Sequence, residues 1–527
     1  MIKEHIKNIL KWIFGRNFEI IVRRPYIAVR KLLYRPVRAL RYCVRGERAI
    51  HRRISRFTVM CLHRWQRTLY DRADQQAGGH GLYRVIEGYI QWSERRYRNS
   101  YCAFRGALDA LSPQQPAVRS GILLMIGTLG PGGAERQAVL TLQGLGRRGI
   151  KPLMLCATQL KTELQRFHLP ALEAAGIACV ELRRNVAEGA YPPLRTARRL
   201  PADLPDVADY MHTLNAHRPM IAHLWLDDVN IRGGLAAVAT GVPSIVLSTR
   251  SMPPYNFALY QPYMREGYRW LMRQPGVTMC NNSVAGARAY EHWLGLSRGR
   301  VRVVYNGFDF DEQLLAASRT RRSAYRARHG IPQDAMVVGT VIRLSEEKRP
   351  LLWAGIAARV RRLLPDTHFL VIGDGPLRKR MEARSNRPDL AGYLHLVGHE
   401  KLALAAMAAM DLFLLISREE GLPNVLIEAQ ALGVPVVTTP VGGAPETLVH
   451  GQTGWSLASD KPDDAGITIV RLLRDKLWLE QAGMSAKGFV KERFAVERMI
   501  DETLEAYGTM PRREDDLGTL VSKKVTS

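Results

Sequence analysis

Two glutamates stand eight residues apart in a stretch whose residue types could bind a sugar. We expect a strand over residues 412–416 to end in a polar turn and a helix to begin at 423–424, so that Glu420 lies in the loop and Glu428 inside the helix. The free N–H groups of a helix's first turn, with the helix dipole, form an anion site. A carboxylate beside them can accept hydrogen bonds from vicinal hydroxyls. Two glutamates at this spacing alone more often belong to an ordinary surface loop and helix.

Arg343 and Lys348 follow another predicted strand, residues 336–341, in the string VIRLSEEK. Breaking a bond between a sugar and a phosphate leaves a diphosphate with extra negative charge. A divalent metal, or a set of cations and oriented N–H groups, must stabilise that charge. Arginine supplies a planar fork of donors and lysine a compact point charge. With the helix start at Asn424 these cations would make a metal unnecessary, whereas taken alone they would be a solvated loop. We predict a catalytic set of Arg343, Lys348 and Glu420, with no metal site and no required cofactor.

Short apolar segments alternate with helix-length segments from residue 121 onward. A strand over 122–126 is followed by a glycine-rich loop and a helix over 134–147. Two series of such β-α units predict an α/β protein with two doubly wound parallel sheets, whose ligands lie beyond the carboxyl ends of the strands. Two facing domains of this type would form a cleft. The further predicted strands are 152–156, 221–225, 244–247 and 301–304 in the first domain, and 369–372, 394–397 and 435–438 in the second.

Several motifs occur together in the second half of the chain. The string EGLPNVLIEA contains Glu-x7-Glu and is followed by GVPVV and by GG-x-x-E. This string resembles glycosyltransferase family 4, whose members are retaining, nucleotide-sugar-dependent enzymes of the GT-B type fold. The resemblance covers roughly residues 121–508. It also includes GGAER (132–136), YNGFD (305–309), VIRLSEEK with Arg343 and Lys348, GDGP (373–376) and VGH (397–399).

The resemblance implies roles for the charged residues of these motifs. Arg343 and Lys348 match the pair that grips the donor diphosphate. Glu420 matches the glutamate that contacts hydroxyls of the donor sugar, and Glu428 the one that holds the ribose hydroxyls. A nucleotide-diphosphate sugar would be the donor substrate.

The remaining donor-binding candidates would act through their backbone groups, or by allowing the chain to come close to the donor. The chain near Val397 and Gly398 would lie near the base. Gly132 and Gly133 would let the N-terminal loop approach the diphosphate and the acceptor. Beside Glu428, the donor-binding candidates are Gly132, Gly133, Val397, Gly398, Gly421, Asn424 and Val425.

The acceptor side departs from the family pattern. Many members have a histidine after the strand that corresponds to residues 244–247, where it faces the reacting sugar. This chain has Ser248-Thr249-Arg250 there. Arg250 would bind a phosphate or an acidic acceptor, or would pair with a carboxylate. His223, on another predicted strand, is either a substitute for the missing histidine or a core residue, so both residues are acceptor-side candidates.

Other motifs are compatible with more than one role. Asp309 and Asp311 form an Asp-x-Asp pair that would hold Mg²⁺ with a phosphate or would cap a linker turn. The loop GTLGPGGAE differs in spacing from a dinucleotide fingerprint. Gly442-Gly443 is either a simple turn or a close backbone approach to a sugar. Glu446 either caps the following turn or contacts the donor.

The net charge of +27 is concentrated at the N-terminus, where residues 1–120 contain 25 Lys and Arg against 8 Asp and Glu, a net of +17. Isoleucine and leucine recur at helical spacing over residues 2–13, with Lys3, Lys7 and Lys11 alongside. This pattern is typical of a basic amphipathic helix on an anionic membrane surface. A basic helical domain packed on the rest of the protein is the alternative. Nucleic-acid binding is a third interpretation, for which we find no motif.

Cysteine usage and hydropathy indicate where the chain would work. The six cysteines form no C-x-x-C pair, and no apolar run is long enough to span a bilayer. We see no secretory signal. We therefore predict a reducing, cytoplasmic location, peripheral on the inner face of the cytoplasmic membrane.

These observations predict a basic helical extension (1–118), an acceptor-side Rossmann-like domain (119–320) and a nucleotide-sugar-binding Rossmann-like domain (321–490). A helix that crosses back (491–509) and a mobile tail (510–527) would follow. The chain would move a sugar to a glycan or lipid-linked acceptor in surface polysaccharide or lipopolysaccharide synthesis, with retention of anomeric configuration. It would bind no nucleic acid. The alternatives are a sugar-nucleotide epimerase of the same fold and a non-catalytic polysaccharide- or nucleic-acid-binding protein.

Overall fold

The computed structural model describes residues 80–110 and 119–508, with short gaps at 152, 183–195, 202–203, 205, 258–259, 262 and 401–402, and side chains from residue 94 onward. The predicted amphipathic N-terminal helix and the tail from residue 510 lie outside these residues. The chain divides into two compact units. The first contains helix α4 (His80–Asp109) as far as residue 99, together with residues 254–264, and here the rings of Tyr97 and Tyr263 meet edge to face at 6.5 Å. No helix of the described residues is long and apolar enough to cross a bilayer.

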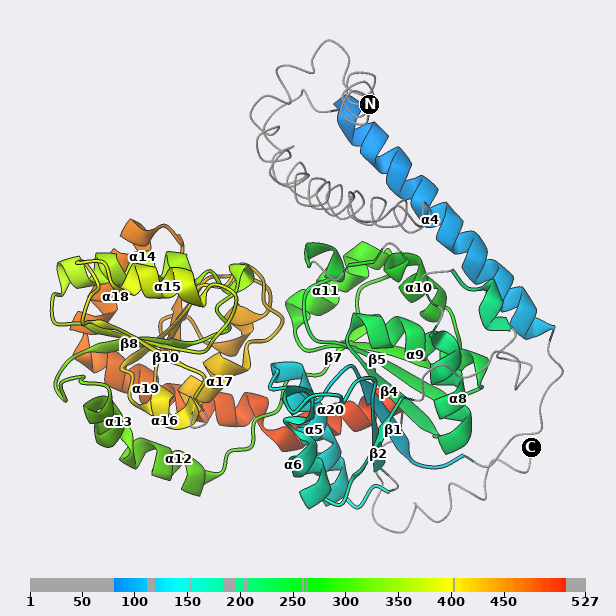
Figure 1. The fold of residues 1–527 in the computed structure, drawn as a ribbon, viewed down its shortest axis with the longest axis horizontal. Coiled ribbons are helices and arrows are strands. Elements are labelled where there is room, and N and C mark those ends of the chain that lie inside the picture. The colour runs from blue at the N-terminus through cyan, green and yellow to red at the C-terminus, as the bar shows by residue number, and fades with distance from the viewer. Residues whose placement is uncertain are drawn as a thin grey trace. The chain divides into compact units, whose positions relative to one another are not determined.

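The second unit contains two sheets. In the described residues the first sheet has seven parallel strands in the order β3-β2-β1-β4-β5-β6-β7. The central strands β1 and β4 are buried at every residue, because helices cover both faces. Figure 1 shows α8 and α9 on one face, and α5 and α20 (Val496–Tyr507) on the other. The strands are β1 (Ile122–Ile126), β2 (Leu153–Ala157), β3 (Ala178–Glu181), β4 (Ile221–Trp225), β5 (Ser244–Thr249), β6 (Val277–Asn281) and β7 (Val301–Val303); the helices are α5 (Gly133–Arg147), α6 (Leu169–Ala174), α8 (Val207–His217), α9 (Asp227–Ala239), α10 (Met264–Leu271) and α11 (Val284–Leu294).

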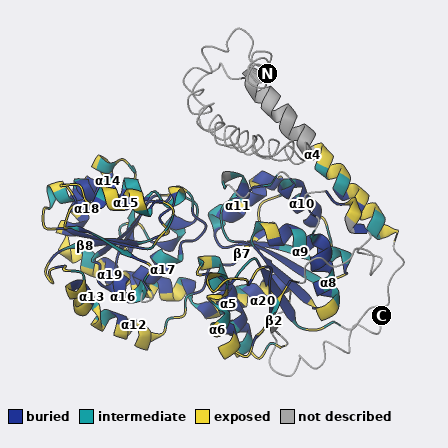
Figure 2. Cartoon of the chain, in the orientation of Figure 1, coloured by how far each residue is buried: buried dark blue, intermediate teal, exposed yellow. Residues whose placement is uncertain are grey.

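The second sheet, over the residues that the structure describes, has six parallel strands in the order β10-β9-β8-β11-β12-β13. Helices α14 and α15 lie on one face, and α16 and α17 on the other (Figure 1). The central strands of both sheets are among the most deeply buried segments of the described residues (Figure 2). The strands are β8 (Val337–Val341), β9 (His368–Ile372), β10 (Leu394–Gly398), β11 (Leu412–Leu415), β12 (Val436–Thr438) and β13 (Gly454–Ser456); the helices are α12 (Glu312–Thr320), α13 (Arg322–Arg328), α14 (Pro350–Leu363), α15 (Arg378–Ser385), α16 (Ala403–Ala408), α17 (Asn424–Ala431), α18 (Pro462–Arg474) and α19 (Lys476–Phe494).

The prediction of two doubly wound parallel sheets is confirmed. Three short strands, β3, β6 and β13, were not predicted.

The chain passes between the two sheets twice, and the two passages are hydrogen-bonded to each other. The N–H of Phe308 donates to the carbonyl of Phe494 at 2.7 Å, and the N–H of Val496 donates to the carbonyl of Phe308 at 3.2 Å. The side chain of Gln137, on α5, binds both backbone groups of Gly307 at 2.7 and 2.8 Å. The first passage, at Gly307 and Phe308, is therefore held by the second passage, at Phe494–Val496, and by helix α5, which packs on the first sheet. The domain built on the first sheet is called the first domain below, and the domain built on the second sheet the second domain.

Helix α20 completes the core of the first sheet. Its apolar residues Val496, Met499, Ile500 and Leu504 are buried in one cluster with residues of β1, α5, β4 and β5. Helix α5 can come close to α20 because Gly144 has no side chain. A Cβ built at Gly144 would lie only 2.5 Å from the Ile500 side chain. The last described helix of the chain therefore belongs to the packing of the first domain.

Candidate active site

Lys348 and Glu420 meet where the connections of the second sheet change direction. Strands β8 and β11 are neighbours, but β8 leads to β9 on one side and β11 to β12 on the other. Ligands bind beyond such a point in doubly wound sheets. The Nζ of Lys348 donates to Oε1 of Glu420 at 2.6 Å, and the side chains are 25% and 8% exposed. The two residues predicted at separate strand ends therefore form one charged pair.

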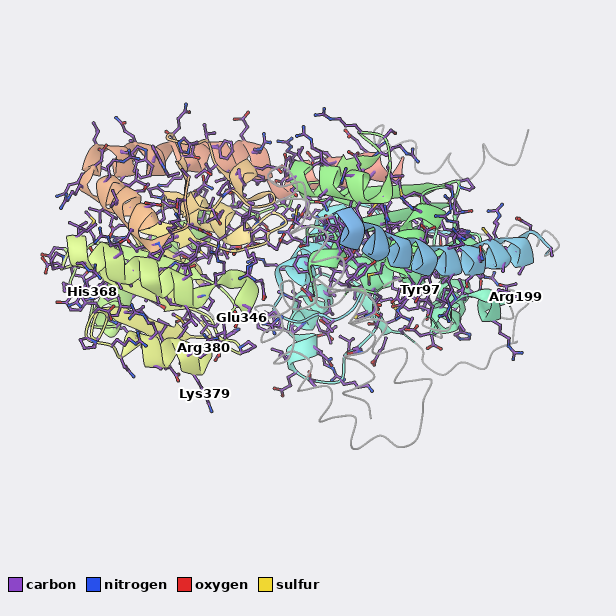
Figure 3. The ribbon with its side chains drawn as sticks, turned by 90° about the horizontal axis from the view of Figure 1, so that it is seen from above. Tyr97, Arg199, Glu346, His368, Lys379 and Arg380 are labelled. Carbon is purple, nitrogen blue, oxygen red and sulfur yellow. The ribbon has the colours of Figure 1, made fainter. Side chains whose placement is uncertain are left out.

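Two acidic residues, Glu346 and Glu347, connect the loop that carries Lys348 to neighbouring segments. The N–H of Arg418 donates to the carbonyl of Glu347 at 2.8 Å, which ties this loop to the loop of Glu420. Burial alone would raise the pKa of Glu347, but hydrogen bonds, chiefly from Ser345, and nearby cations outweigh it and lower that pKa. Glu346 pairs with Arg380 of α15 at 3.4 Å (Figure 3).

Arg343 is exposed at the start of the same loop. Its positive charge is one of those that lower the pKa of Glu347. In the described part of the chain no hydrogen bond or ion pair joins its side chain to Lys348 or Glu420. The structure thus brings two of the three predicted catalytic residues into contact and places the third on the same loop.

Helix α17 begins directly after the loop of Glu420. Pro423 stands at its N-cap position, and no side chain caps the first turn, so the first N–H groups of the helix keep their capacity to bind an anion. Asn424 and Val425 of this turn are half-buried, and Glu428 one turn later is buried. The arrangement matches the predicted helix mouth, with one carboxylate before it and one inside it.

A glycine of the first domain, Gly133 at the start of α5, comes close to this helix. The side-chain amide of Asn424 lies 3.5 Å from the carbonyl of Gly133, and a Cβ at Gly133 would be 3.0 Å from the same nitrogen. The adjacent Gly132 precedes α5, and a Cβ there would overlap the carboxylate of Glu135. Both positions therefore suit glycine because neighbouring groups come close.

Gly421, Gly442 and Gly443 allow another close approach. A Cβ at Gly421 would lie 2.5 Å from the carbonyl oxygen of Arg250, and a Cβ at Gly443 would overlap the carbonyl of Gly421. Gly442 has a φ of +51°, in the left-handed region, and packs against the backbone of Glu420. The glycine pair is therefore a turn that supports the loop of Glu420.

Val397 and Gly398 lie at the carboxyl end of β10, at the edge of the sheet. Gly398 has a φ of +82°, and its carbonyl accepts from the N–H of Gly373 at 2.7 Å. Among the described contacts none joins Val397 or Gly398 to the Lys348–Glu420 pair.

His223 is buried and hydrogen-bonded at both ring nitrogens. Nδ1 lies 2.8 Å from the hydroxyl of Tyr507 and Nε2 lies 2.8 Å from the hydroxyl of Ser248. Burial, with the charge of Arg250, holds the pKa of His223 well below its usual value. Its position is that of a satisfied core histidine.

Arg250 follows β5 and lies over the ring of Trp225, 3.7 Å from its centroid. Nη1 donates to the carbonyl of Val304 at 3.4 Å and to Oδ1 of Asn306 at 3.3 Å. Nε and Nη2 are buried without a hydrogen-bond partner, and burial lowers the pKa of Arg250 to about 10. No carboxylate of a described residue pairs with this guanidinium.

Asp227 stands at the point where the connections of the first sheet change direction, beyond the end of β4. Its Oδ1 accepts from the hydroxyls of Tyr268 and Tyr290 at 2.7 and 2.6 Å, and burial raises its pKa. The preceding residue, Leu226, has a φ of +72°, which is strained for a side chain of this type. Asp227 was not among the predicted site residues, although its place after a predicted strand was a usable signal.

Three further contacts between the two sheet domains were not predicted. The guanidinium of Arg136, on α5, pairs with the carboxylate of Glu428. The side-chain amide of Asn306 donates to the carbonyl of Leu422 at 3.1 Å and to Oδ1 of Asn424 at 2.7 Å. The motifs GGAER and YNGFD contain these residues, but only the fold places them against α17.

Glu446 forms the third contact. Its two carboxylate oxygens accept from the N–H groups of Val284 and Ala285 at 2.8 Å each, and Oε2 also accepts from the hydroxyl of Tyr305 at 2.9 Å. Glu446 therefore caps helix α11 of the first domain, whereas its predicted role was to cap its own turn or to contact the donor. Asp311 caps α12 by accepting from two N–H groups at 3.0 Å each. No cluster of described residues has the ligands to hold a metal ion.

Two family models match the chain. Residues 131–312 match the model "Glycosyltransferase Family 4", and residues 335–475 match "Glycosyl transferases group 1". The Vi polysaccharide biosynthesis protein VipC/TviE of Salmonella typhi is 31% identical over 423 residues, which cover 74% of this chain and 72% of that protein. The 2-deoxystreptamine glucosyltransferase of Streptomyces kanamyceticus is 27% identical over 391 residues, or 71% of this chain and 94% of that protein.

A solved structure shares the fold. The Anabaena protein Alr3699/HepE, crystallised in complex with UDP and glucose, superposes with a TM-score of 0.62 over 74% of this chain and all of its own, at 21% sequence identity.

Proposed function

This chain belongs to glycosyltransferase family 4, and from that premise we propose that it adds a sugar to a growing surface polysaccharide or lipopolysaccharide, on a glycan or lipid-linked acceptor. The resemblance predicted from the sequence is confirmed. The chain is a retaining, nucleotide-sugar-dependent glycosyltransferase, which decides against the epimerase and the non-catalytic protein. The Salmonella typhi relative, named for Vi polysaccharide biosynthesis, supports the polysaccharide as the product.

The pairing of Lys348 with Glu420 is the observation that carries the proposed site. Lys348, Arg343 and the first N–H groups of α17 would bind the donor diphosphate, and Glu420 would bind hydroxyls of the sugar. Because Lys348 and Glu420 touch, the diphosphate and the sugar ring would lie on either side of one cation–carboxylate pair. These cations would offset the charge of the leaving group without a metal ion.

Glu428 would hold the ribose, and Val397 and Gly398 would lie near the base. Gly132, Gly133, Gly421, Asn424 and Val425 would complete the donor site through backbone groups and close approach. Arg250, whose Nε and Nη2 have no partner, suits an acceptor that carries a phosphate or carboxylate. His223 is the weaker acceptor-side candidate, because both of its ring nitrogens are engaged.

The reaction would proceed by attack on the same face that the leaving group departs from. The bond from the acceptor oxygen to the anomeric carbon forms as the bond from that carbon to the phosphate oxygen breaks. The acceptor's hydroxyl proton passes to the departing phosphate oxygen. No carboxylate needs to bond to the sugar, and the configuration is retained.

Product analysis tests this function. The purified chain, incubated with a panel of nucleotide sugars and a membrane extract containing lipid-linked acceptors, is expected to lengthen one acceptor with the donor's anomeric configuration. UDP-glucose is the first donor to try, because HepE, which shares the fold, was crystallised with UDP and glucose. Inversion of the anomeric centre, or isomerisation of the donor without an acceptor, would contradict the proposal.

The basic N-terminal extension would hold the enzyme on the inner face of the cytoplasmic membrane. Its excess of Lys and Arg is the support for this part of the proposal. Deleting residues 1–60 is expected to abolish binding to vesicles that contain anionic lipid, measured by co-sedimentation. Binding that survives the deletion would contradict the anchor.

A further inference from the structure

Arg136 joins the two sheet domains at the predicted ribose site. It lies in the first turns of α5 in the first domain, whereas Glu428 lies in α17 of the second. The guanidinium Nη2 donates to Oε1 of Glu428. The glutamate side chain is only 4% exposed and the arginine 39%, so the arginine reaches from a more open position to a buried carboxylate.

The pair leaves part of the carboxylate free. Within the described residues, no hydrogen bond other than that of Arg136 reaches the carboxylate of Glu428, and the bond from Arg136 goes to Oε1. A carboxylate has about four lone-pair sites on its two oxygens. Oε2 therefore keeps its capacity to accept hydrogen bonds from hydroxyl groups while Arg136 balances the charge.

Arg136 stands next to a contact between α5 and the first passage between the sheets. The next residue, Gln137, holds both backbone groups of Gly307 in the first passage between the sheets. Because Arg136 and Glu428 belong to different sheet domains, their pairing depends on how the two domains pack against each other. Removing Arg136 would lower the stability of this arrangement, because the buried charge of Glu428 would be left without compensation.

We propose that Arg136 is a positioning residue for the donor: it orients Glu428 toward the ribose hydroxyls and makes that grip depend on the arrangement of the two domains. This inference rests on the proposed function, in which Glu428 holds the ribose. Arg136 acts through Glu428 and does not touch the reacting atoms. A nucleotide that lacks a ribose hydroxyl gains less from Glu428, so Arg136 contributes to selecting ribose over 2′-deoxyribose.

The experiment compares ribonucleotides with their 2′-deoxy counterparts. Binding of UDP, GDP and ADP and of the three 2′-deoxy nucleotides to the full chain is measured by calorimetry, and the pair with the tightest ribonucleotide is used. The variants are Arg136→Gln, Arg136→Lys, Glu428→Gln and the double variant Arg136→Gln/Glu428→Gln. Arg147→Gln is the control, because Arg147 is an exposed arginine on the same helix.

Arg136→Gln is expected to lower the preference for ribose by about tenfold, with Arg136→Lys keeping most of it and Arg147→Gln all of it. The double variant should lose no more than Glu428→Gln alone, since the arginine acts through that carboxylate. If Glu428→Gln loses the preference and Arg136→Gln keeps it, the inference is wrong and the proposed function stands. If neither variant changes it, the ribose assignment of Glu428 itself is wrong. An additive loss in the double variant would also overturn the inference, because it would show an independent role.

Discussion

The two points at which the sheet connections change direction differ in how their polar residues are used. In the second sheet, Lys348 and Glu420 extend from two loops and pair with each other. In the first sheet, Asp227 and His223 are satisfied by hydroxyls of their own domain. The buried guanidinium of Arg250 instead keeps two donor nitrogens, Nε and Nη2, without a partner. The same sheet topology thus presents charged groups for a ligand in one domain and buries most of them in the other.

This difference explains why the residues of a donor site are easier to recognise in a sequence than those of an acceptor site. A donor diphosphate always needs positive charge, so its site is built from a short loop motif at a strand end. An acceptor has no such constant group. In the first domain the polar residues at the corresponding position hydrogen-bond within the domain, and we expect acceptor binding to depend on exceptions such as Arg250.

The largest effect is expected from removing the charges of Lys348 and Glu420 in the second sheet domain. Lys348→Ala and Glu420→Gln are each expected to lower sugar transfer about a hundredfold, because each removes a charged group that we propose to bind the diphosphate or the sugar. Initial rates with a nucleotide-sugar donor check this. Lys379→Ala is the matched control, since Lys379 projects from α15 into solvent (Figure 3). Transfer rates for both site variants within twofold of the control would contradict the assignment.

The corresponding change in the first sheet should act on stability instead. His223→Phe leaves the hydroxyls of Tyr507 and Ser248 without their partner, which costs about 2 kcal/mol of unfolding free energy. Urea denaturation measures that loss. The transfer rate per folded molecule should stay unchanged, and His292→Phe, at an exposed position of α11, should affect neither quantity. A variant that is stable but inactive would assign His223 to the acceptor side.

Arg250 should behave differently from its neighbour His223. Arg250→Gln is expected to raise the KM of the acceptor about tenfold, or about 1.4 kcal/mol, while the KM of the nucleotide sugar stays within about twofold. The reason is that its partnerless guanidinium nitrogens suit an acidic group of the acceptor. Steady-state kinetics with both substrates varied makes the distinction. A rise in the donor KM of the same size would place Arg250 on the donor side.

The packing of α5 against α20 predicts a smaller effect. Gly144→Ala is expected to destabilise the first domain by about 1 kcal/mol, because its Cβ would press on the side chain of Ile500. Thermal unfolding monitored by circular dichroism checks this. Gly488→Ala on α19 has open space around it and should be neutral or stabilising. Equal melting temperatures for the two variants would show that the contact yields without cost.

One histidine in each domain predicts the smallest effect, a dependence of stability on pH. Burial, helped by nearby positive charge, lowers the pKa of His168 in the first domain and of His395 in the second to about 4. The folded state thus favours the neutral rings, so stability is complete above pH 6.5 and falls as the pH decreases from there toward 4. Melting temperatures between pH 7.5 and 5 should show this decrease. His168→Gln and His395→Gln should each reduce it, and an unchanged slope in both would contradict the prediction.

Much of the architecture was predictable, because buried parallel strands appear as continuous apolar runs. The strands that were missed are short or polar. β3 is half-exposed at the sheet edge, β6 carries Thr278 and Asn281, and β13 has three residues. Each of these segments is a strand because it hydrogen-bonds to a neighbouring strand. Its own residues do not form the apolar run from which a strand is predicted.

The same distinction holds for the site. Lys348 and Glu420 could be named because each stands in a loop after a strand, within a motif that resembles glycosyltransferase family 4. The pairing of Arg136 with Glu428 and the cap that Glu446 places on α11 could not be named, since each joins residues far apart in the sequence. Such contacts depend on how the two domains pack, which no local spacing expresses.

Helix α20 has a consequence for how the protein is made. Until the ribosome has synthesised Val496–Tyr507, the face of the first sheet that this helix covers has no lid, although the rest of that domain emerged almost two hundred residues earlier. A nascent chain at that stage shows apolar surface that attracts chaperones and other chains. A premature stop codon between the last strand of the first sheet and residue 496 would therefore leave an already translated domain without the helix that covers its core.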